Sequence, residues 1–225
     1  MYQRNVILAA LVVAAVAFAQ NPIQADSPFQ VRYAVNLTTV GASASYVNVT
    51  NTGANGASVY GSGYGTASGN ICVNVYAFDA NEEMLACCSC FVTPDETLGL
   101  NVVSDIFAKP LTGAGVPATA TIKLLATLDG TGGSGGASGC NNSAAAVGTA
   151  TTVAGLAAWG TTVHTVPVTV AGTGYAFTET AFTPSTLGAG ELASLASRCA
   201  FIIGNGTGYG ICKSCEAQAL GASKM

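Results

Sequence analysis

The feature that most constrains how this chain folds is its set of eight cysteines in 225 residues. They are Cys72, Cys87, Cys88, Cys90, Cys140, Cys199, Cys212 and Cys215. An even number of cysteines behind a secretory signal indicates disulfide bonds, and each bond contributes roughly 2–4 kcal/mol, mainly by restricting the unfolded chain. We therefore expect these cysteines to form disulfides that staple the fold in an oxidising compartment.

Residues 1–19 have the pattern of a secretory signal peptide. Arg4 gives a basic start, and the uncharged apolar run over residues 6–19 ends in a small-x-small cleavage sequence. The alternative is a membrane anchor, but a spanning helix needs about 20 apolar residues and this run is shorter. The sequence predicts cleavage after Ala19 and a mature chain, residues 20–225, without a transmembrane segment. We expect that chain to be secreted or held at the cell envelope or surface.

Composition argues against several partner classes. Only 8% of residues are charged and 28 are glycine, whereas a disordered chain is rich in charge, so an ordered fold is expected. Removing Arg4 leaves six basic and eleven acidic residues, a net charge of −5. A weakly acidic chain with scattered Lys and Arg lacks the basic patch that nucleic-acid binding requires. The sequence suggests no cofactor, and the expected partners are further copies of the chain or other envelope proteins.

Apolar and polar residues alternate along much of the chain, which is the pattern of half-buried β-strands. In residues 29–38, Val31, Tyr33 and Val35 alternate with Arg32, Ala34 and Asn36. Similar runs occupy residues 46–49, 98–107, 118–128, 160–172 and 175–182. Short strands with turn signals between them predict a mainly β chain, folded as a single antiparallel β-sandwich domain over residues 20–225.

Residues 71–95 form the clearest element, a β-hairpin. Two β-rich runs flank the turn sequence at residues 79–82, and Pro94 ends the second run because proline cannot donate to a ladder. With the turn centred near residue 81, the expected cross-strand pairs are Phe78 with Met84, Tyr76 with Ala86, Asn74 with Cys88, and Cys72 with Cys90.

Residues 129–158 form the region of lowest complexity. They are rich in Gly, Ala, Ser and Thr, which predicts a long surface excursion rather than a core element. Cys140 lies within this region, so we expect a disulfide to tie the excursion down at one point.

One short helix is expected near the C-terminus. Ser185 or Thr186 caps it, and Leu192, Leu195 and Cys199 follow at i, i+3 and i+7. The residues after it, AFIIGNGTGYGICKSC, predict a strand, an Asn-Gly turn and a second strand, and hence a C-terminal hairpin.

Strand geometry narrows the disulfide pairings without choosing among them. Successive residues of a strand point to opposite faces, so Cys88 and Cys90 share one face and Cys87 lies on the other. The pairings left open are Cys72 with Cys90, Cys199 with Cys212 or Cys215, and a link from the cluster at residues 87–90 to Cys140 or to the C-terminal cysteines.

Metal or redox chemistry is the alternative use of the cysteines. The C-x-x-C motif of Cys212 and Cys215, combined with Cys88 and Cys90, offers four thiolates to zinc. A C-x-x-C motif indicates thioredoxin-like chemistry beside a βαβ pattern in a reducing compartment, whereas this one ends a predicted hairpin in an exported chain. Disulfides are therefore the favoured interpretation.

The turn of the first hairpin resembles the start of a calcium loop. Asp79, Asn81 and Glu83 offer oxygen ligands at positions 1, 3 and 5. Met84 stands where position 6 requires glycine, and the bidentate glutamate at position 12 is missing, so an acidic hairpin turn is the better interpretation. His164 lies among threonines in a predicted strand without an acidic neighbour in sequence, and it is interpreted as a packed or exposed histidine.

The blocks ICVNVYAFDANEEMLACCSCFVTPD and RCAFIIGNGTGYGICKSC resemble those of secreted, cysteine-containing β proteins of acidobacteria. The resemblance covers about a fifth of the chain. It implies export and paired cysteine-rich blocks, and it assigns no catalytic residue.

The leading hypothesis for function is a non-enzymatic, disulfide-stabilised structural, adhesive or coat protein, with an exposed strand edge as a means of self-assembly or partner capture. The second is a small-ligand or carbohydrate-binding module. That hypothesis requires the aromatic side chains to gather on one face of the fold, since sugars stack on aromatic rings. The aromatic candidates are Tyr46, Tyr60, Tyr64, Trp159 and Tyr175.

The third hypothesis is a secreted hydrolase that uses two carboxylates in a cleft. Paired catalytic carboxylates lie about 5–10 Å apart in such enzymes. The candidates are Asp79, Glu82, Asp95, Glu96 and Asp105. No catalytic residue is assigned among them, because no pattern in the sequence pairs two of these groups.

Overall fold

The structure is a computed structural model that describes residues 27–38, 45–57, 69–113, 115–128, 137–167 and 174–213. The expected signal peptide lies outside the described residues, as do Tyr60, Tyr64 and Cys215. Among the helices of the described part, none combines the length and the apolar character that crossing a bilayer requires.

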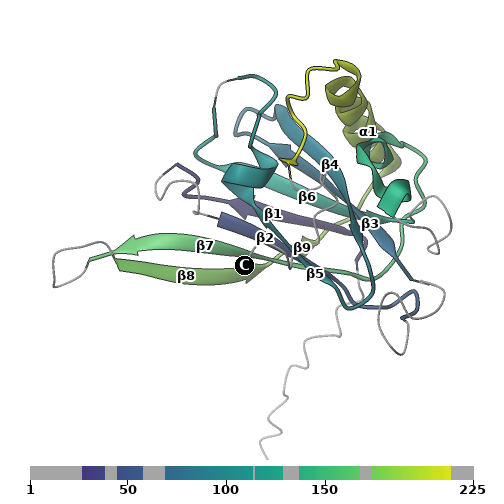
Figure 1. Ribbon diagram of the computed structural model, residues 1–225, viewed down its shortest axis with the longest axis horizontal. Coiled ribbons are helices and arrows are strands. Elements are labelled where there is room, and N and C mark those ends of the chain that lie inside the picture. The colour runs from purple at the N-terminus through teal and green to yellow at the C-terminus, as the bar shows by residue number, and fades with distance from the viewer. Residues whose placement is uncertain are drawn as a thin grey trace, which may run out of the picture.

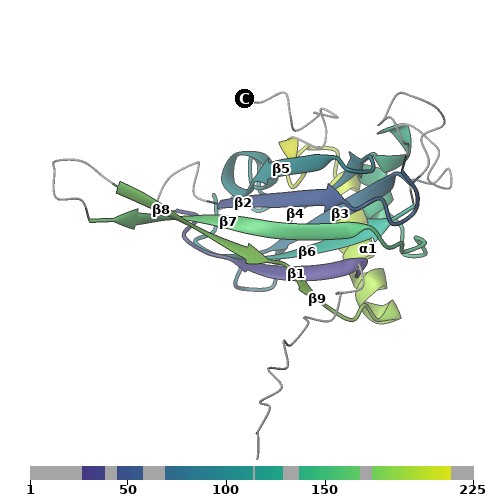
Figure 2. The same cartoon turned by 90° about the horizontal axis from the view of Figure 1, so that it is seen from below.

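The chain is mainly β and forms two antiparallel sheets (Figures 1 and 2). The first sheet has the strand order β4-β3-β6-β1-β9, and the second has the order β5-β2-β7-β8. The strands are β1 (Phe29–Ala34), β2 (Ser45–Asn51), β3 (Ile71–Phe78), β4 (Met84–Val92), β5 (Thr97–Asn101), β6 (Ala120–Thr127), β7 (Leu156–Val166), β8 (Gly174–Ala181) and β9 (Thr183–Pro184). The expected fold class, a mainly β chain with one short helix near the C-terminus and disulfide bonds, is confirmed.

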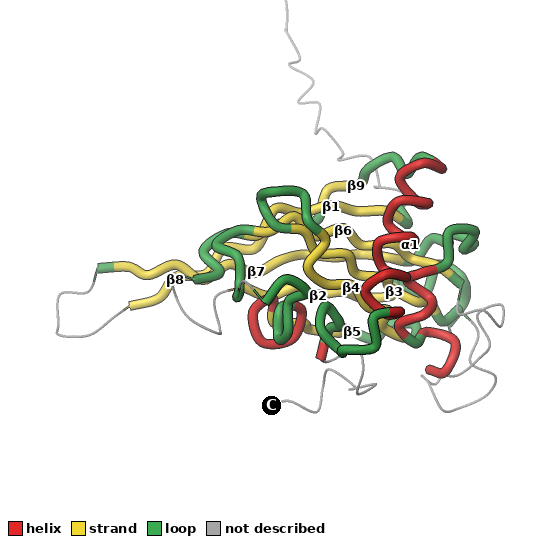
Figure 3. Tube along the Cα trace, turned by 90° about the horizontal axis from the view of Figure 1, so that it is seen from above, coloured by secondary structure: helices red, strands yellow, loops and turns green. Residues whose placement is uncertain are grey.

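The helical elements lie against this framework rather than inside it (Figure 3). They are the π-helical turn η1 (Val102–Ile106), the 3-10 turns η2 (Ala137–Cys140) and η3 (Asn142–Ala146), and the α-helix α1 (Ala189–Gly204). The strand expected over residues 98–107 therefore ends at Asn101. The Asn101 side chain caps η1, because its Oδ1 accepts hydrogen bonds from the backbone N–H groups of Val103 and Ser104, both at 2.9 Å.

Apolar side chains form two clusters, one on each face of the first sheet. The larger lies between the two sheets, where Val73 and Val75 of β3 and Val47 and Val49 of β2 are fully buried. The smaller lies on the opposite face of the first sheet, beneath α1 and η3, and includes Tyr76. The molecule thus has three layers: the second sheet, the first sheet, and the helical cover (Figure 3).

The hairpin of β3 and β4 forms as expected, but its register differs from the expected one. Phe78 faces Met84 as predicted, whereas Ala77 faces Ala86. Leu85 is left without a partner on β3, and this bulge shifts every later pair by one residue. Tyr76 faces Cys87, Asn74 faces Ser89, and Cys72 faces Phe91, so these three predicted pairs are wrong.

The shift of one residue also excludes the Cys72–Cys90 link. A slip of this size moves a side chain to the other face of a sheet. Cys90 packs in the cluster between the sheets, while Cys72 shares the opposite face with Tyr76. Cys72 instead forms a disulfide with Cys140, which ties residues 137–146 to that face.

Two further disulfides join β4 to the C-terminal part of the chain. Cys87 is bonded to Cys199 of α1, and Cys88 is bonded to Cys212. Cys90 is disulfide-bonded as well. Of the pairings left open, a link from the cluster at residues 87–90 to the C-terminal cysteines is therefore present, and the pairing of Cys199 with Cys212 or Cys215 is wrong.

The predicted C-terminal hairpin is wrong because α1 continues through its first half. The helix runs from Ala189 to Gly204 and buries Leu195, Cys199 and Ile202 against the first sheet. Gly188, not Ser185 or Thr186, is the N-cap residue, and it makes no side-chain capping bond. After the helix the chain returns along β4, where the Cys87 N–H donates to the Gly210 carbonyl at 2.8 Å.

A row of polar side chains connects β1 of the first sheet to β7 of the second. Gln30 Nε2 donates to the Leu156 carbonyl at 2.7 Å, and Arg32 Nη2 donates to Thr162 Oγ1 at 2.7 Å. Arg32 is only 6% exposed, and its Nε and Nη1 make no hydrogen bond to the described residues. Burial lowers the pKa of the Arg32 guanidinium. Gly160 provides the space that this group fills.

Candidate functional site

The outer face of the second sheet is the candidate binding surface. Along β2 and along residues 156–162 of β7, buried and partly exposed residues alternate, with the buried ones directed at the first sheet. On β5, the exposed Thr97 and Gly99 alternate with the buried Leu98 and Leu100. This alternation leaves one side of a four-stranded sheet without cover from the described residues.

The cross-strand register brings four aromatic residues to this outer face. Tyr46 of β2 faces Thr161 of β7, and Trp159 lies two residues before Thr161 on β7. On β8, Phe177 faces Val163 and Tyr175 faces Thr165. Residues paired across strands share a face, and so do residues two apart on one strand. The aromatic face is the name we use for the surface formed by Tyr46, Trp159, Tyr175 and Phe177 together with Asn48, Gly99, Thr161 and Glu179.

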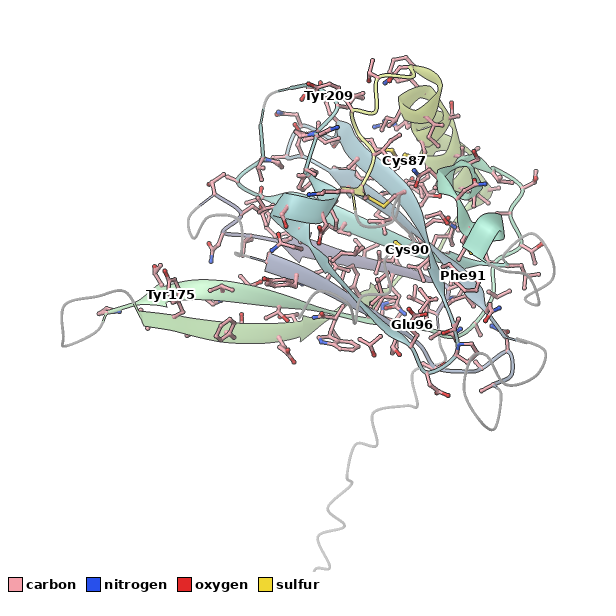
Figure 4. All side chains as sticks on the ribbon, viewed as in Figure 1. Cys87, Cys90, Phe91, Glu96, Tyr175 and Tyr209 are labelled. Atoms are coloured by element: carbon pink, nitrogen blue, oxygen red, sulfur yellow. A yellow bond between two sulfur atoms is a disulfide. The ribbon has the colours of Figure 1, made fainter. Side chains whose placement is uncertain are left out.

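The aromatic residues differ in their exposure. Tyr46 and Trp159 are partly exposed, while Tyr175 is 55% and Phe177 is 67% exposed. Tyr175 faces Thr165, which lies six residues after Trp159 on β7. At about 3.3 Å per residue, the Trp159 and Tyr175 rings are therefore about 20 Å apart along the strand. Figure 4 shows Tyr175 towards the far end of β8, well away from Cys87 and Cys90 on β4. The rings thus follow the length of the β7–β8 hairpin.

Polar groups connect the strands across the aromatic face. Asn48 Nδ2 donates to Thr161 Oγ1 at 3.2 Å, and Thr161 Oγ1 donates to Glu179 Oε1 at 3.3 Å. Gly99 lies opposite Asn48 on β5, and a side chain added at Gly99 would contact Asn48 Oδ1. The glycine therefore keeps this amide oxygen accessible beside the aromatic rings.

Three of the five predicted aromatic candidates belong to this face: Tyr46, Trp159 and Tyr175. Tyr60 and Tyr64 lie outside the described residues. Phe177, Asn48 and Glu179 were not among the predicted site residues. Their position in the period-two pattern could have indicated them, because Phe177 and Glu179 have the same parity as Tyr175 within one strand.

The five predicted carboxylates are divided among three places. Asp79 and Glu82 lie in the β3–β4 turn, Asp95 and Glu96 follow β4, and Asp105 lies in η1. Most have structural partners: Asp79 Oδ1 accepts the backbone N–H groups of Asn81 and Glu83, both at 2.9 Å. Glu96 Oε2 accepts the Thr93 N–H at 2.8 Å, and Asp105 Oδ2 accepts the Asn101 N–H at 2.8 Å.

A second feature is a cluster of charges beside α1. Glu191 of α1 forms an ion pair with Lys123 of β6, and the Lys123 ammonium lies 5.1 Å from the centre of the Phe78 ring. Arg198 lies over the same ring and donates to the Glu82 carbonyl at 2.8 Å. Together with Asp79 they line a pocket of about 300 Å³. These contacts fasten the helix to the β3–β4 turn.

The remaining predicted sites have structural partners. Cys88 and Cys212 are bonded to each other, so the four-thiolate zinc set does not form. In the turn with the calcium-like spacing, the Asp79 carboxylate is bonded to the turn itself. Within the described residues, no three His, Cys, Asp or Glu side chains are grouped to hold a metal ion. His164 lies between Asn36 Nδ2 at 3.1 Å and Thr178 Oγ1 at 2.8 Å.

Comparison of this chain with protein-family models, with curated proteins and with solved structures gives no match.

Proposed function

We propose that this chain is an exported, disulfide-stabilised surface protein with an adhesion-type role, and that it binds a neutral polysaccharide through the aromatic face. The observation that carries the proposal is the gathering of Tyr46, Trp159, Tyr175 and Phe177 on one side of the β5-β2-β7-β8 sheet. The three disulfides fit an extracytoplasmic protein, because such bonds persist in oxidising compartments.

The chemistry of the aromatic face matches that of a sugar chain. A pyranose ring presents an apolar C–H face that packs on an aromatic ring, while its hydroxyl groups project at the edges. The amide of Asn48, the hydroxyl of Thr161 and the carboxylate of Glu179 form a line beside the rings and can exchange hydrogen bonds with such hydroxyls. Ligand sites combine aromatic surface with a few placed polar groups in this way.

Charge favours a neutral polysaccharide over an anionic one. Glu179 is the only charged residue of the aromatic face, and it is negative. The whole chain has a formal net charge of −4. An anionic polysaccharide would meet repulsion at this surface, whereas the carboxylate accepts hydrogen bonds from neutral sugar hydroxyls.

The first test is sedimentation of the purified protein with insoluble neutral polysaccharides. For each polysaccharide that retains the protein, the binding affinity is then measured by titration with its soluble oligosaccharides. Trp159→Ala and Tyr46→Ala should each weaken binding by about 2- to 13-fold, the equivalent of about 0.5–1.5 kcal/mol for one aromatic contact. The matched control is Tyr33→Ala, which removes a tyrosine that is 60% exposed on β1 of the other sheet.

Retention of circular dichroism and of the intact disulfide mass would show that each variant is folded. Binding that is weakened to this extent in Trp159→Ala and unchanged in Tyr33→Ala supports the proposal. No retention on any neutral polysaccharide, or equal effects of the two substitutions, would overturn it.

A further inference from the structure

The distal part of the β7–β8 hairpin extends beyond the rest of its sheet (Figures 1 and 2). Among the described residues, pairing of β7 with β2 stops at Thr162, and residues 163–166 of β7 pair there with β8 alone, at residues 174–177. We call these two short segments the arm. An isolated two-stranded hairpin is marginally stable in water. The arm nevertheless carries three large apolar side chains that are at least 36% exposed, Val166, Tyr175 and Phe177.

The outer backbone edge of β8 has no strand beside it among the described residues. The Phe182 N–H donates to the Ala158 carbonyl at 2.9 Å, so the backbone of residue 182 is directed at β7. Hydrogen-bonding direction alternates along an antiparallel strand. The N–H and C=O groups of Tyr175, Phe177 and Glu179 are therefore directed away from β7, at the open edge.

The sequence of β8 gives this edge little protection. Proteins block exposed edges with lysine, proline, bulges or very short strands. β8 has eight residues, GYAFTETA, without lysine or proline, and its ladder with β7 is regular throughout. Glu179 is its one charged residue.

We propose that the open edge of β8 pairs with β8 of a second copy of the chain. The two strands run antiparallel about a two-fold axis, with Phe177 opposite its own counterpart and Tyr175 opposite Glu179 of the other copy. The two β5-β2-β7-β8 sheets become one continuous sheet of eight strands, and the arm residues 174–177 of each copy lie beside residues 177–180 of the other.

Hydrogen bonding and charge select this register. Phe177, Tyr175 and Glu179 all direct their backbone groups outward, so all three form ladder bonds when Phe177 lies at the two-fold axis. The register places the two Phe177 rings side by side, and aromatic cross-strand pairs stabilise sheets. It also sets each Glu179 against a tyrosine rather than against the other glutamate, which avoids the repulsion of like charges directly opposite each other.

Oligomeric state tests the proposal first. Light scattering after size exclusion should give the mass of a dimer for the disulfide-intact protein at high concentration. Phe177→Lys should shift that mass to the monomer at the same concentration, because two lysines would then meet at the two-fold axis. The control Val166→Lys changes an exposed apolar residue of the arm on β7, away from the open edge, and should stay dimeric. A monomeric wild type, or monomers in both variants, would overturn the proposal.

Cross-linking tests the register. Directly opposite residues in a hydrogen-bonded antiparallel pair have Cα atoms about 5.5 Å apart, within the range that a disulfide spans. Phe177→Cys should therefore form a dimer linked through residue 177 under mild oxidation. Tyr175→Cys should not link to itself, because its two copies would lie about 14 Å apart at 3.4 Å per residue. Equal cross-linking of the two variants would overturn the register, and so would linkage through Tyr175→Cys alone.

Discussion

Cys87 and Cys88 are neighbours on β4, yet their disulfides lie on opposite faces of the same sheet. Cys87 reaches outward to Cys199 of α1, and Cys88 reaches into the space between the sheets to Cys212. Two adjacent residues thus attach the helical cover and the chain that follows it to both sides of one strand. The segment from Cys199 to Cys212 is fixed to the sandwich at both of its ends.

Removing the outward disulfide should release α1 more than it disturbs the sheets. The double variant Cys87→Ala/Cys199→Ala opens a loop of 112 residues and should lower the free energy of unfolding by about 2–5 kcal/mol. Hydrogen exchange should increase most at residues 189–204, since local opening precedes global unfolding where an attachment is lost. The control Cys72→Ala/Cys140→Ala should affect α1 less, and equal exchange in α1 for the two variants would contradict this assignment.

The fourth disulfide should join Cys90 to Cys215. Cys90 is disulfide-bonded, and the six cysteines other than Cys90 and Cys215 are bonded in the three pairs described above. Digestion without reduction, followed by mass spectrometry, should give a linked pair of peptides containing Cys90 and Cys215. The intact protein should be lighter than its reduced form by eight hydrogen atoms. A peptide with alkylated Cys215 in unreduced protein would refute the pairing.

Gly160 and Arg32 should be energetically coupled. A Cβ at residue 160 would lie 1.9 Å from the Arg32 guanidinium carbon, so one of the two must shift. Gly160→Ala should lower the free energy of unfolding by about 1–3 kcal/mol, the usual cost of overpacking a core. In an Arg32→Ala background the same substitution should cost much less, which urea unfolding of all four proteins would measure. Equal costs in both backgrounds would mean that the two residues are not coupled.

Tyr76 should make the protein sensitive to alkaline pH. Its hydroxyl donates to the Ala145 carbonyl at 2.9 Å, and burial raises the pKa of this phenol above its ordinary value. The unfolded chain then loses the proton first, so the stability contributed by neutral Tyr76 is fully present below about pH 10 and is lost as the pH rises further.

The comparison of wild type with Tyr76→Phe isolates this contribution. At pH 8 the variant should be less stable by about 1 kcal/mol, because the Ala145 carbonyl loses its donor. At pH 11 that difference should shrink by about 1 kcal/mol, because only the wild type has a buried phenol that ionises on unfolding. Tyr33→Phe, which changes an exposed residue, serves as the control. A difference between wild type and Tyr76→Phe that is constant from pH 8 to pH 11 would exclude the effect.

The β3–β4 hairpin shows where prediction from sequence reaches its limit. Its two strands, its turn and its end before Pro94 follow from local residue types, and these features were predicted. The register was not, because Leu85 bulges out of the ladder at a position that has no sequence mark. The bulge allows both Leu85 and Ala86 to enter the core between the sheets. The bulge is stabilised by packing against the second sheet, which lies outside the hairpin sequence.

The C-terminal segment shows a second limit. The run AFII is compatible with a strand or with the last turns of a helix, and the Asn-Gly pair after it favoured a hairpin. The helix forms instead of the hairpin because helical spacing directs Leu195, Cys199 and Ile202 at the outer face of the first sheet, where they are buried. That face is formed by strands that are distant in the chain, so the local sequence pattern could not decide between helix and hairpin.

The sequence by itself determined the class of this protein, because alternating apolar residues and eight cysteines suffice for a disulfide-bonded, mainly β fold. Its aromatic residues were also identified as candidates for binding. Tertiary structure alone decided the disulfide pairs and the gathering of Tyr46, Trp159 and Tyr175 on one face. Both depend on which face of a strand each side chain occupies, and a shift of one residue in register reverses that face. Register is set by contacts between strands that are distant in the chain, so it emerges only when the sheets assemble.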